Sequence, residues 1–123
     1  MPLDPNAIPG LLRALDSIDV YVRIVAAEAL GKIGNPIAIK RLVETLEDPR
    51  PDVRRRVIKA LTRIGTEPRI PVAAQVVPGL ERGLYDAEAS VQWAAESGLR
   101  TLNTSAAREA LSIWHGYLAS RNL

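Results

Sequence analysis

Cysteine and phenylalanine are missing from this chain, and histidine occurs once, as His115. The absence of cysteine excludes disulfide bonds, thiolate metal ligands and cysteine nucleophiles. A single histidine offers no second imidazole to complete a metal site or to share acid–base work. We therefore expect no bound metal and no cofactor, and we expect His115 to be a partly buried residue of a terminal helix.

Long apolar runs are missing as well. No segment approaches the roughly 18 to 20 apolar residues of a membrane-spanning helix, and no basic start followed by an apolar stretch marks a leader. A glycine-rich phosphate loop and a nucleophile elbow are also absent. The sequence predicts a soluble, cytoplasmic protein that does not bind membranes and is not an enzyme.

The small share of aromatic residues restricts the fold. Aromatic residues make up 4% of the chain, although 47% of it is hydrophobic. Alanine, leucine, isoleucine and valine must therefore fill the interior, and these residues suit closely packed helices. Strands with alternating β-branched and aromatic residues do not occur. The composition predicts an all-α fold.

A repeated pattern is the most informative feature that the sequence does contain. Val22-Arg23, followed by Ala29-Leu30 and Ile33-Gly34, returns 31 residues later as Val53-Arg54, followed by Ala60-Leu61 and Ile64-Gly65. A weaker third copy begins at Val91-Gln92, 38 residues after the second. Self-similarity at such periods is typical of stacked helical repeats, which offer binding surfaces rather than buried catalytic pockets.

Proline, glycine and asparagine indicate where the helices begin and end. Asp4-Pro5 and Asn35-Pro36 place a capping side chain before a proline at the first helical position. Gly34 and Asn103 stand where a left-handed C-terminal cap is expected. We expect one domain over residues 1–123, with repeats at about 5–34, 35–65 and 66–103 and a capping helix at 104–121. The segment 66–78 is an insertion, in which residues 71–77 are expected to form an extra turn or a kinked extension.

The second helix of each repeat carries a stripe of apolar residues at helical spacing. In the second repeat the stripe consists of Val53, Val57, Ala60, Leu61 and Ile64. Its equivalents are Val22, Ala26, Ala29, Leu30 and Ile33 in the first repeat, and Val91, Ala95, Gly98, Leu99 and Leu102 in the third. We expect these residues to be buried. Neighbouring helix backbones should approach most closely at the small residues Ala29, Ala60 and Gly98.

The chain resembles the HEAT repeat, in particular the short bacterial form called the phycobilisome-lyase HEAT-like repeat. The residues that carry this resemblance are Val53-Arg54 with Leu46-Glu47-Asp48-Pro49 before them and Ala60-Leu61 and Ile64-Gly65 after them. The third repeat departs from the pattern, because Gln92 replaces the arginine and Asn103 the final glycine. The resemblance implies an α-solenoid, a right-handed superhelix of about three helical hairpins plus a C-terminal capping helix.

The resemblance also implies roles for individual parts. The second helices would line a concave face that holds another macromolecule. Arg23 and Arg54 would be structural residues that bind the acidic turn of their own or an adjacent repeat. Their expected partners are Asp16, Asp19, Asp48 and Asp52.

Positive charge is concentrated on the exposed side of the helix that covers residues 52–64. Stacking places Tyr21 and Ile24 of the first repeat and Trp93 of the third beside these cations. Tryptophan, tyrosine and arginine are enriched at the residues that dominate binding energy. We therefore predict an adaptor that binds the acidic surface of a protein partner. The predicted contact residues are Tyr21, Ile24, Arg55, Arg56, Lys59, Arg63 and Trp93.

Two other functions are compatible with the sequence. A basic stripe with flanking aromatic residues also suits nucleic acid, with cations on phosphates and rings on unpaired bases, although Glu28 and Asp52 interrupt the stripe. The family resemblance admits an accessory subunit of a phycobilin-lyase-like enzyme. We expect a monomer or a weak dimer, because leftover apolar surface on the last helix offers a dimer contact.

Overall fold

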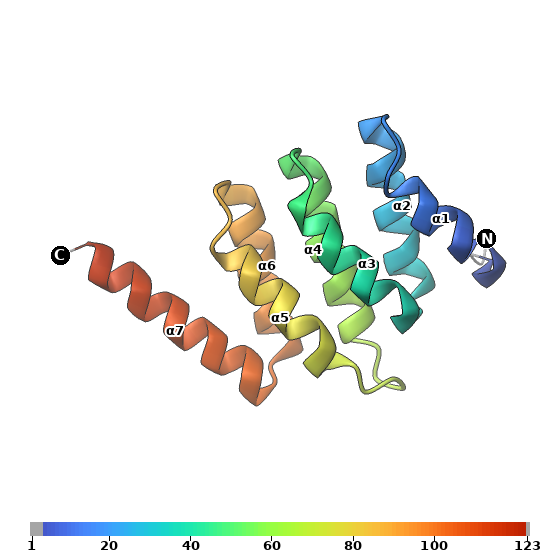
Figure 1. The fold of residues 1–123 in the computed structure, drawn as a ribbon. Coiled ribbons are helices and arrows are strands. Elements are labelled where there is room, and N and C mark those ends of the chain that lie inside the picture. The colour runs from blue at the N-terminus through green and yellow to red at the C-terminus, as the bar shows by residue number, and fades with distance from the viewer. Residues whose placement is uncertain (1–3, 123) are drawn as a thin grey trace.

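Residues 4–122 are described by the computed structural model, and every regular element within them is helical. The α-helices are α1 (Ile8–Ala14), α2 (Val20–Ile33), α3 (Ile39–Glu44), α4 (Pro51–Gly65), α5 (Ala73–Leu84), α6 (Ala89–Leu102) and α7 (Ser105–Arg121) (Figure 1). Three short 3-10 turns, η1 (Pro5–Ala7), η2 (Pro36–Ala38) and η3 (Thr45–Glu47), adjoin α1 and α3. The predicted all-α fold is confirmed for this part of the chain. None of these helices combines the length and apolar character that crossing a bilayer requires.

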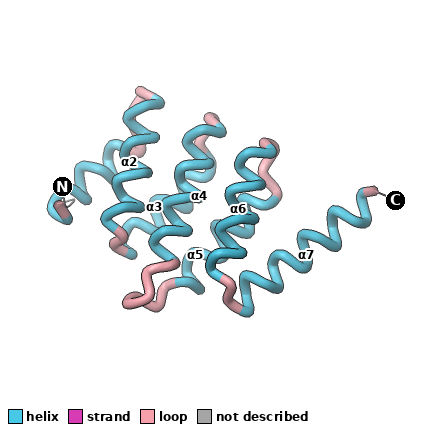
Figure 2. The backbone as a smooth tube through the Cα atoms, turned by 180° about the vertical axis from the view of Figure 1, so that it is seen from behind, coloured by secondary structure: helices cyan, strands magenta, loops and turns pink. Residues whose placement is uncertain are grey.

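The helices form two layers along the array. Helices α1, α3, α5 and α7 lie in one layer (Figure 1), and the view from behind shows α2, α4 and α6 in the other (Figure 2). Helix α4 packs between α2 and α6, and α7 packs against both α5 and α6. The chain is therefore a helical repeat solenoid, in which each helix is stabilised mainly by its neighbours.

Capping side chains begin the first and third helical segments as predicted. The side chains of Asp4 and Asn35 accept hydrogen bonds from backbone N–H groups two residues ahead, at 2.9 and 3.0 Å. The first turn after each proline is a 3-10 turn, so α1 and α3 begin one turn after the capping residue, at Ile8 and Ile39. Pro9 lies in the first turn of α1, where its missing N–H costs no helical hydrogen bond.

Left-handed residues end α2 and α6. Gly34 has a φ of 76° and Asn103 a φ of 51°, and both predicted caps are confirmed. Their backbone N–H groups donate to the carbonyls of Leu30 and Leu99 at 3.1 and 3.0 Å. These bonds satisfy carbonyl groups that the helix ends would otherwise leave unpaired.

The predicted apolar stripe is buried in the second and third repeats. All five stripe residues of α4 are buried, and so are those of α6 except Leu102, which is partly exposed. The first repeat differs at Val22, which is 40% exposed, and at Ala29 and Ile33, which are partly exposed. The reason is positional, because α2 has a second helix on one side only within the described residues.

Small residues let the second helices approach closely. A Cβ atom added to Gly31 of α2 would lie 2.8 Å from the Cα atom of Ala60 on α4. A Cβ atom added to Gly98 of α6 would overlap the hydroxyl group of Thr62 on α4. Close approach is thus confirmed at Ala60 and Gly98. Ala29 occupies the same position on α2, which has no preceding second helix to contact within the described residues.

The insertion in the third repeat lengthens one helix. Residues 66–72 form the connection between α4 and α5, and α5 begins at Ala73, before Pro78. The expected extension is therefore helical from Ala73 onward. Gly83 of the same helix packs tightly, since an added Cβ atom would lie 2.7 Å from Ile58 Cδ1.

Helix α7 closes the described array. Its buried residues are Ala107, Ala110, Leu111 and Trp114. His115 is exposed, and its Nε2 atom lies 3.4 Å from Oε1 of Glu96. The expectation of a partly buried His115 is wrong, because Trp114 occupies the inward-facing position one residue earlier.

Candidate interaction surface

Three stacked helices bring the predicted contact residues to one side of the molecule, which we call the second-helix face. The face consists of Tyr21, Ile24, Glu28 and Lys32 of α2, Asp52, Arg55, Arg56, Lys59 and Arg63 of α4, and Ser90, Trp93, Ser97 and Thr101 of α6. Tyr21 is 74% exposed and Trp93 is 67% exposed. Both aromatic rings are therefore available to a partner.

A hollow of about 290 Å³ lies between α2 and α4 on this face. Arg56, Lys59 and Arg63 line it from α4, and Glu28 and Lys32 line it from α2. The closely packed backbones of the two helices hold these side chains at a fixed separation. Four cations and one carboxylate thus share a single depression.

A second hollow of about 130 Å³ lies between α4 and α6. It is lined by Lys59 and Thr62 of α4 and, on the α6 side, by Trp93, Ala94, Ser97, Gly98 and Thr101. Lys59 lines both hollows, so they adjoin one another across α4. Trp93 also lines a hollow of about 280 Å³ further along α6, with Glu96 and Arg100.

These hollows bring together only part of the predicted set. Arg56, Lys59 and Arg63 share the first hollow, and Trp93 joins Lys59 in the second. The remaining three residues, Tyr21, Ile24 and Arg55, lie on the same face but do not line either hollow.

Ion pairs within the chain neutralise some of the cations on the second-helix face. Arg56 is paired with Glu28 across the helix interface, and Arg55 Nη2 lies 3.3 Å from Asp52 Oδ1. Lys32, Lys59 and Arg63 have no ion-pair partner among residues 4–122. Uncompensated charge therefore lies toward the C-terminal ends of α2 and α4.

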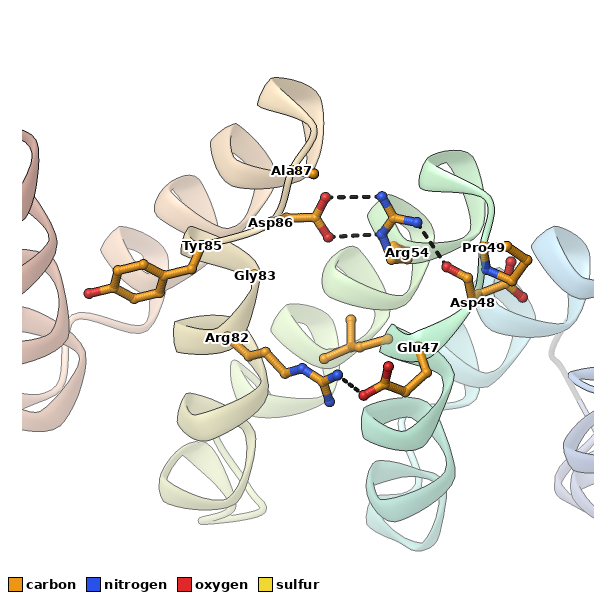
Figure 3. A pocket seen from close by; sticks show the side chains of 10 residues that line it. Glu47, Asp48, Pro49, Arg54, Arg82, Gly83, Tyr85, Asp86 and Ala87 are labelled. Atoms are coloured by element: carbon orange, nitrogen blue, oxygen red, sulfur yellow. Dashed lines mark hydrogen bonds and ion pairs between the residues drawn. The ribbon is translucent and has the colours of Figure 1, made fainter.

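A second group of charges, the arginine ladder, ties neighbouring repeats together. Arg23 Nε lies 2.8 Å from Asp48 Oδ2, and Arg54 Nε lies 2.8 Å from Asp86 Oδ2 (Figure 3). The Nη2 atoms donate to the second carboxylate oxygens at 3.3 and 3.0 Å, so both pairs are bidentate. Each arginine also donates to a backbone carbonyl, that of Ser17 or Asp48, at 2.8 Å. These arginines are structural, as the sequence predicted.

The other aspartates expected to bind Arg23 or Arg54 have different partners. Asp16 accepts a hydrogen bond from Arg41 at 2.9 Å, Asp19 caps α2 by accepting from Tyr21 N, and Asp52 pairs with Arg55. The ladder instead runs forward, from each arginine to the turn of the next repeat. Gln92 keeps only the bond within its own repeat, donating from Nε2 to the carbonyl of Asp86 at 2.5 Å.

The environment of Asp86 favours its charged form. Burial opposes ionisation, but hydrogen bonds from Arg54 and from the backbone N–H of Glu88, with the charges of Arg54 and Arg82, outweigh it. The pKa of Asp86 is therefore lowered below its ordinary value. The same pair raises the pKa of Arg54, chiefly through its hydrogen bond to Asp86, although burial works in the opposite direction.

Around this ladder lies a hollow of about 480 Å³, shown in Figure 3. Its charged side chains are all ion-paired: Arg54 with Asp86, Arg82 with Glu47, and Asp48 with Arg23. Among residues 4–122, no three carboxylate or imidazole side chains gather as a metal site requires. The hollow is thus built around structural ion pairs.

An aromatic cluster at the far end was not found by sequence reasoning. The ring of Tyr85 lies 5.0 Å from that of Trp114 and 5.5 Å from that of Tyr117, centroid to centroid. With Leu118, Arg121 and others these rings line a hollow of about 360 Å³. Tyr85 directly follows the end of α5, and Trp114 and Tyr117 lie on α7, so only the packing of α5 against α7 brings the rings together.

Comparison with known proteins gives two findings. The family model described as HEAT repeats matches residues 8–100 of this chain. The phycocyanobilin lyase subunit alpha of Picosynechococcus sp. is 36% identical over 83 residues. That alignment covers 62% of this chain and 31% of the relative, so the chain spans less than a third of the relative's length.

Proposed function

The chain belongs to the HEAT repeat family, whose members are generally protein-interaction scaffolds, and on that premise we propose that it is a non-catalytic adaptor for an acidic protein partner. The partner would bind the second-helix face. One observation carries this proposal: Lys32, Lys59 and Arg63 line adjoining hollows without an ion-pair partner in the described residues, beside the exposed ring of Trp93.

The two kinds of residue would act at different stages of binding. The uncompensated cations attract an acidic surface from a distance and favour its correct orientation. Trp93 and Tyr21 then supply large, exposed rings whose burial stabilises the complex. Because these side chains stand on packed helices, little backbone ordering is needed on binding, which favours affinity.

The ion-paired arginines would contribute differently. A carboxylate of the partner that enters the hollow between α2 and α4 competes with Glu28 for Arg56. Arg55 is held by Asp52 on its own helix, and Ile24 lies at the equivalent position on α2. We assign Arg55 and Ile24 to the border of the contact, where single residues contribute little energy.

The experiment that tests this function is affinity capture from lysate of the source cell, using the wild type and a Lys59→Glu, Arg63→Glu, Trp93→Ala variant. The matched control is Arg13→Glu with Lys40→Glu, since both are exposed cations outside the second-helix face without ion-pair partners in the described residues. We expect a discrete acidic protein with the wild type and the control, and not with the first variant. Equal recovery with all three proteins would contradict the assignment.

The same experiment separates a nucleic-acid function from a protein partner. Material lost on nuclease treatment would indicate nucleic acid. Its affinity should then fall linearly with salt on logarithmic axes, with a slope of about −0.7 per phosphate contact on a single strand and about −0.9 on a duplex. Recovery of a protein partner should instead be unaffected by nuclease treatment.

A second candidate function is favoured by the relative named phycocyanobilin lyase subunit alpha. On this alternative the chain is an accessory subunit that works with a lyase on phycocyanobilin. The test is to titrate phycocyanobilin with the purified chain and follow the absorption spectrum of the pigment. A saturable spectral change that the Lys59→Glu, Arg63→Glu change abolishes would favour it, and an unchanged spectrum would count against direct pigment binding.

A further inference from the structure

Equivalent positions on the second helices α4 and α6 contact the second helix of the preceding repeat. Ala60 of α4 packs on Gly31 of α2, and Gly98 of α6 packs on Thr62 of α4. The equivalent position on α2 is Ala29. Arg56 of α4 also faces back toward α2, since it pairs with Glu28 there, and its equivalent on α2 is Val25.

Among residues 4–122, nothing covers the equivalent positions of α2. Val53 and Val91 are fully buried in α4 and α6, whereas the equivalent Val22 is 40% exposed and Val25 is 58% exposed. Ile18, in the turn before α2, is fully exposed. We call Ile18, Val22, Val25 and Ala29 the α2 edge. Arg23 brings no free charge to it, because its guanidinium is held by Asp48.

At the other end of the row of second helices, the outer edge of α6 is charged rather than apolar. The positions that contact the following second helix are Gly31 on α2, against Ala60, and Thr62 on α4, against Gly98. On α6 the corresponding residue is Arg100, which forms an ion pair with Glu96 at 2.5 Å. A second helix stacked on α6 in the usual way would bury this pair, which is unfavourable. Head-to-tail stacking of copies is therefore disfavoured.

We propose that the α2 edge binds the same edge of a second copy of this chain, with the two α2 helices antiparallel about a two-fold axis. The apolar residues fit this arrangement, because an axis between Val25 and Ala26 sets Val22 opposite Ala29 and Ile18 opposite Ile33. Their spacing of three and four residues is that of paired helices. A two-fold contact uses one patch twice, so it closes at a dimer and leaves the polar edge of α6 in water.

The absence of cysteine from the chain makes a direct test available. A Val25→Cys variant carries one thiol, next to the proposed axis. We expect mild oxidation to give a disulfide-linked dimer in high yield, and a mixture of separate Val25→Cys and Arg100→Cys chains to give no mixed product above background. A predominant mixed product would show head-to-tail contact and would overturn the proposal.

Sedimentation of the cysteine-free protein supplies an independent readout. We expect the mass to rise from one chain to two with concentration, and Val25→Glu to weaken association at least about tenfold by placing two like charges at the axis. The control is Ile113→Glu, an exposed residue of α7, which should leave association unchanged. A mass that stays at one chain up to about 1 mM, or a dimer that only Ile113→Glu disrupts, would overturn the proposal.

Discussion

On two sides of α4, basic side chains meet different surroundings. Arg54 is 13% exposed and makes a bidentate pair with Asp86, which is also 13% exposed. Lys59 and Arg63, on the second-helix face of the same helix, are exposed and have no ion-pair partner among the described residues. One helix thus carries a cation that ties repeats together and cations that are free to meet a partner.

The comparison shows how repetition separates structure from function in this chain. The position of Arg54 holds arginine in the first repeat as well, and both arginines find an aspartate in the next turn. The position of Lys59 holds Glu28 in the first repeat and Ser97 in the third. Residues that recur with the repeat maintain the stack, and residues that change from repeat to repeat give the surface its individual charge.

The largest effect on stability is expected from a residue of the buried apolar stripe. Leu61 is fully buried in α4, so Leu61→Ala should lower the free energy of unfolding by about 2–5 kcal/mol through lost burial and a cavity. Chemical denaturation followed by circular dichroism measures the change. Thr101→Ala, on the exposed surface of α6, is the control, and a loss below about 0.5 kcal/mol for Leu61→Ala would mean that the helix faces are assigned wrongly.

A smaller loss is expected when the ladder is broken. Arg54→Ala leaves the carboxylate of Asp86 largely buried without its partner, and we expect a loss of about 1–3 kcal/mol, moderated because both groups keep some contact with water. The double variant Arg54→Ala, Asp86→Ala should recover part of it. Additive losses in this double-mutant cycle would show that the two side chains do not stabilise each other.

Acid should weaken the ladder in a defined direction. The pKa of Asp86 is lowered in the folded chain, so its contribution is complete above the unfolded value of about 3.9 and is lost as the pH falls through the folded value. Unfolding free energy measured from pH 6 down to pH 2 should decline below about pH 4. Asp86→Asn should reduce this decline, and an identical profile for the variant would contradict the role of Asp86.

The smallest effect on stability is expected on the second-helix face. Lys59→Glu with Arg63→Glu should change the free energy of unfolding by less than about 0.5 kcal/mol per site, because both side chains are exposed and bind no carboxylate in the described structure. The same variant should lose the proposed partner. Thermal unfolding and affinity capture on one protein sample would measure stability and partner binding separately. A strongly destabilised variant would contradict the view that Lys59 and Arg63 serve binding and not the stack.

The fold could be predicted because its determinants are local. Helical spacing located the stripe of Val53, Val57 and Leu61, and the caps at Gly34 and Asn103 lie where their residue types indicated. The partners of charged side chains could not be predicted in the same way. Arg56 meets Glu28 and Arg54 meets Asp86 only through the packing of helices distant in sequence.

The sequence predicted which residues belong to the candidate site, but not how their side chains lie relative to one another. The sequence placed Lys59 and Trp93 on one face, and the structure makes them lining residues of the same hollow. It could not show that Arg56 is held by Glu28, because that pair depends on how α2 and α4 pack together. His115 was misplaced for a related reason, since a shift of one residue along α7 exchanges it with the buried Trp114.

The replacement of arginine by Gln92 in the third repeat has a consequence for how the chain resists a pulling force. Bidentate pairs join the first repeat to the second and the second to the third, whereas Gln92 makes its ladder bond within the third repeat. A pulling force along the array would therefore meet no bidentate pair between α6 and α7, where apolar packing and the ring contacts of Tyr85 hold the last helix. Single-molecule stretching should show α7 detaching first, at a lower force than the repeats joined by arginine.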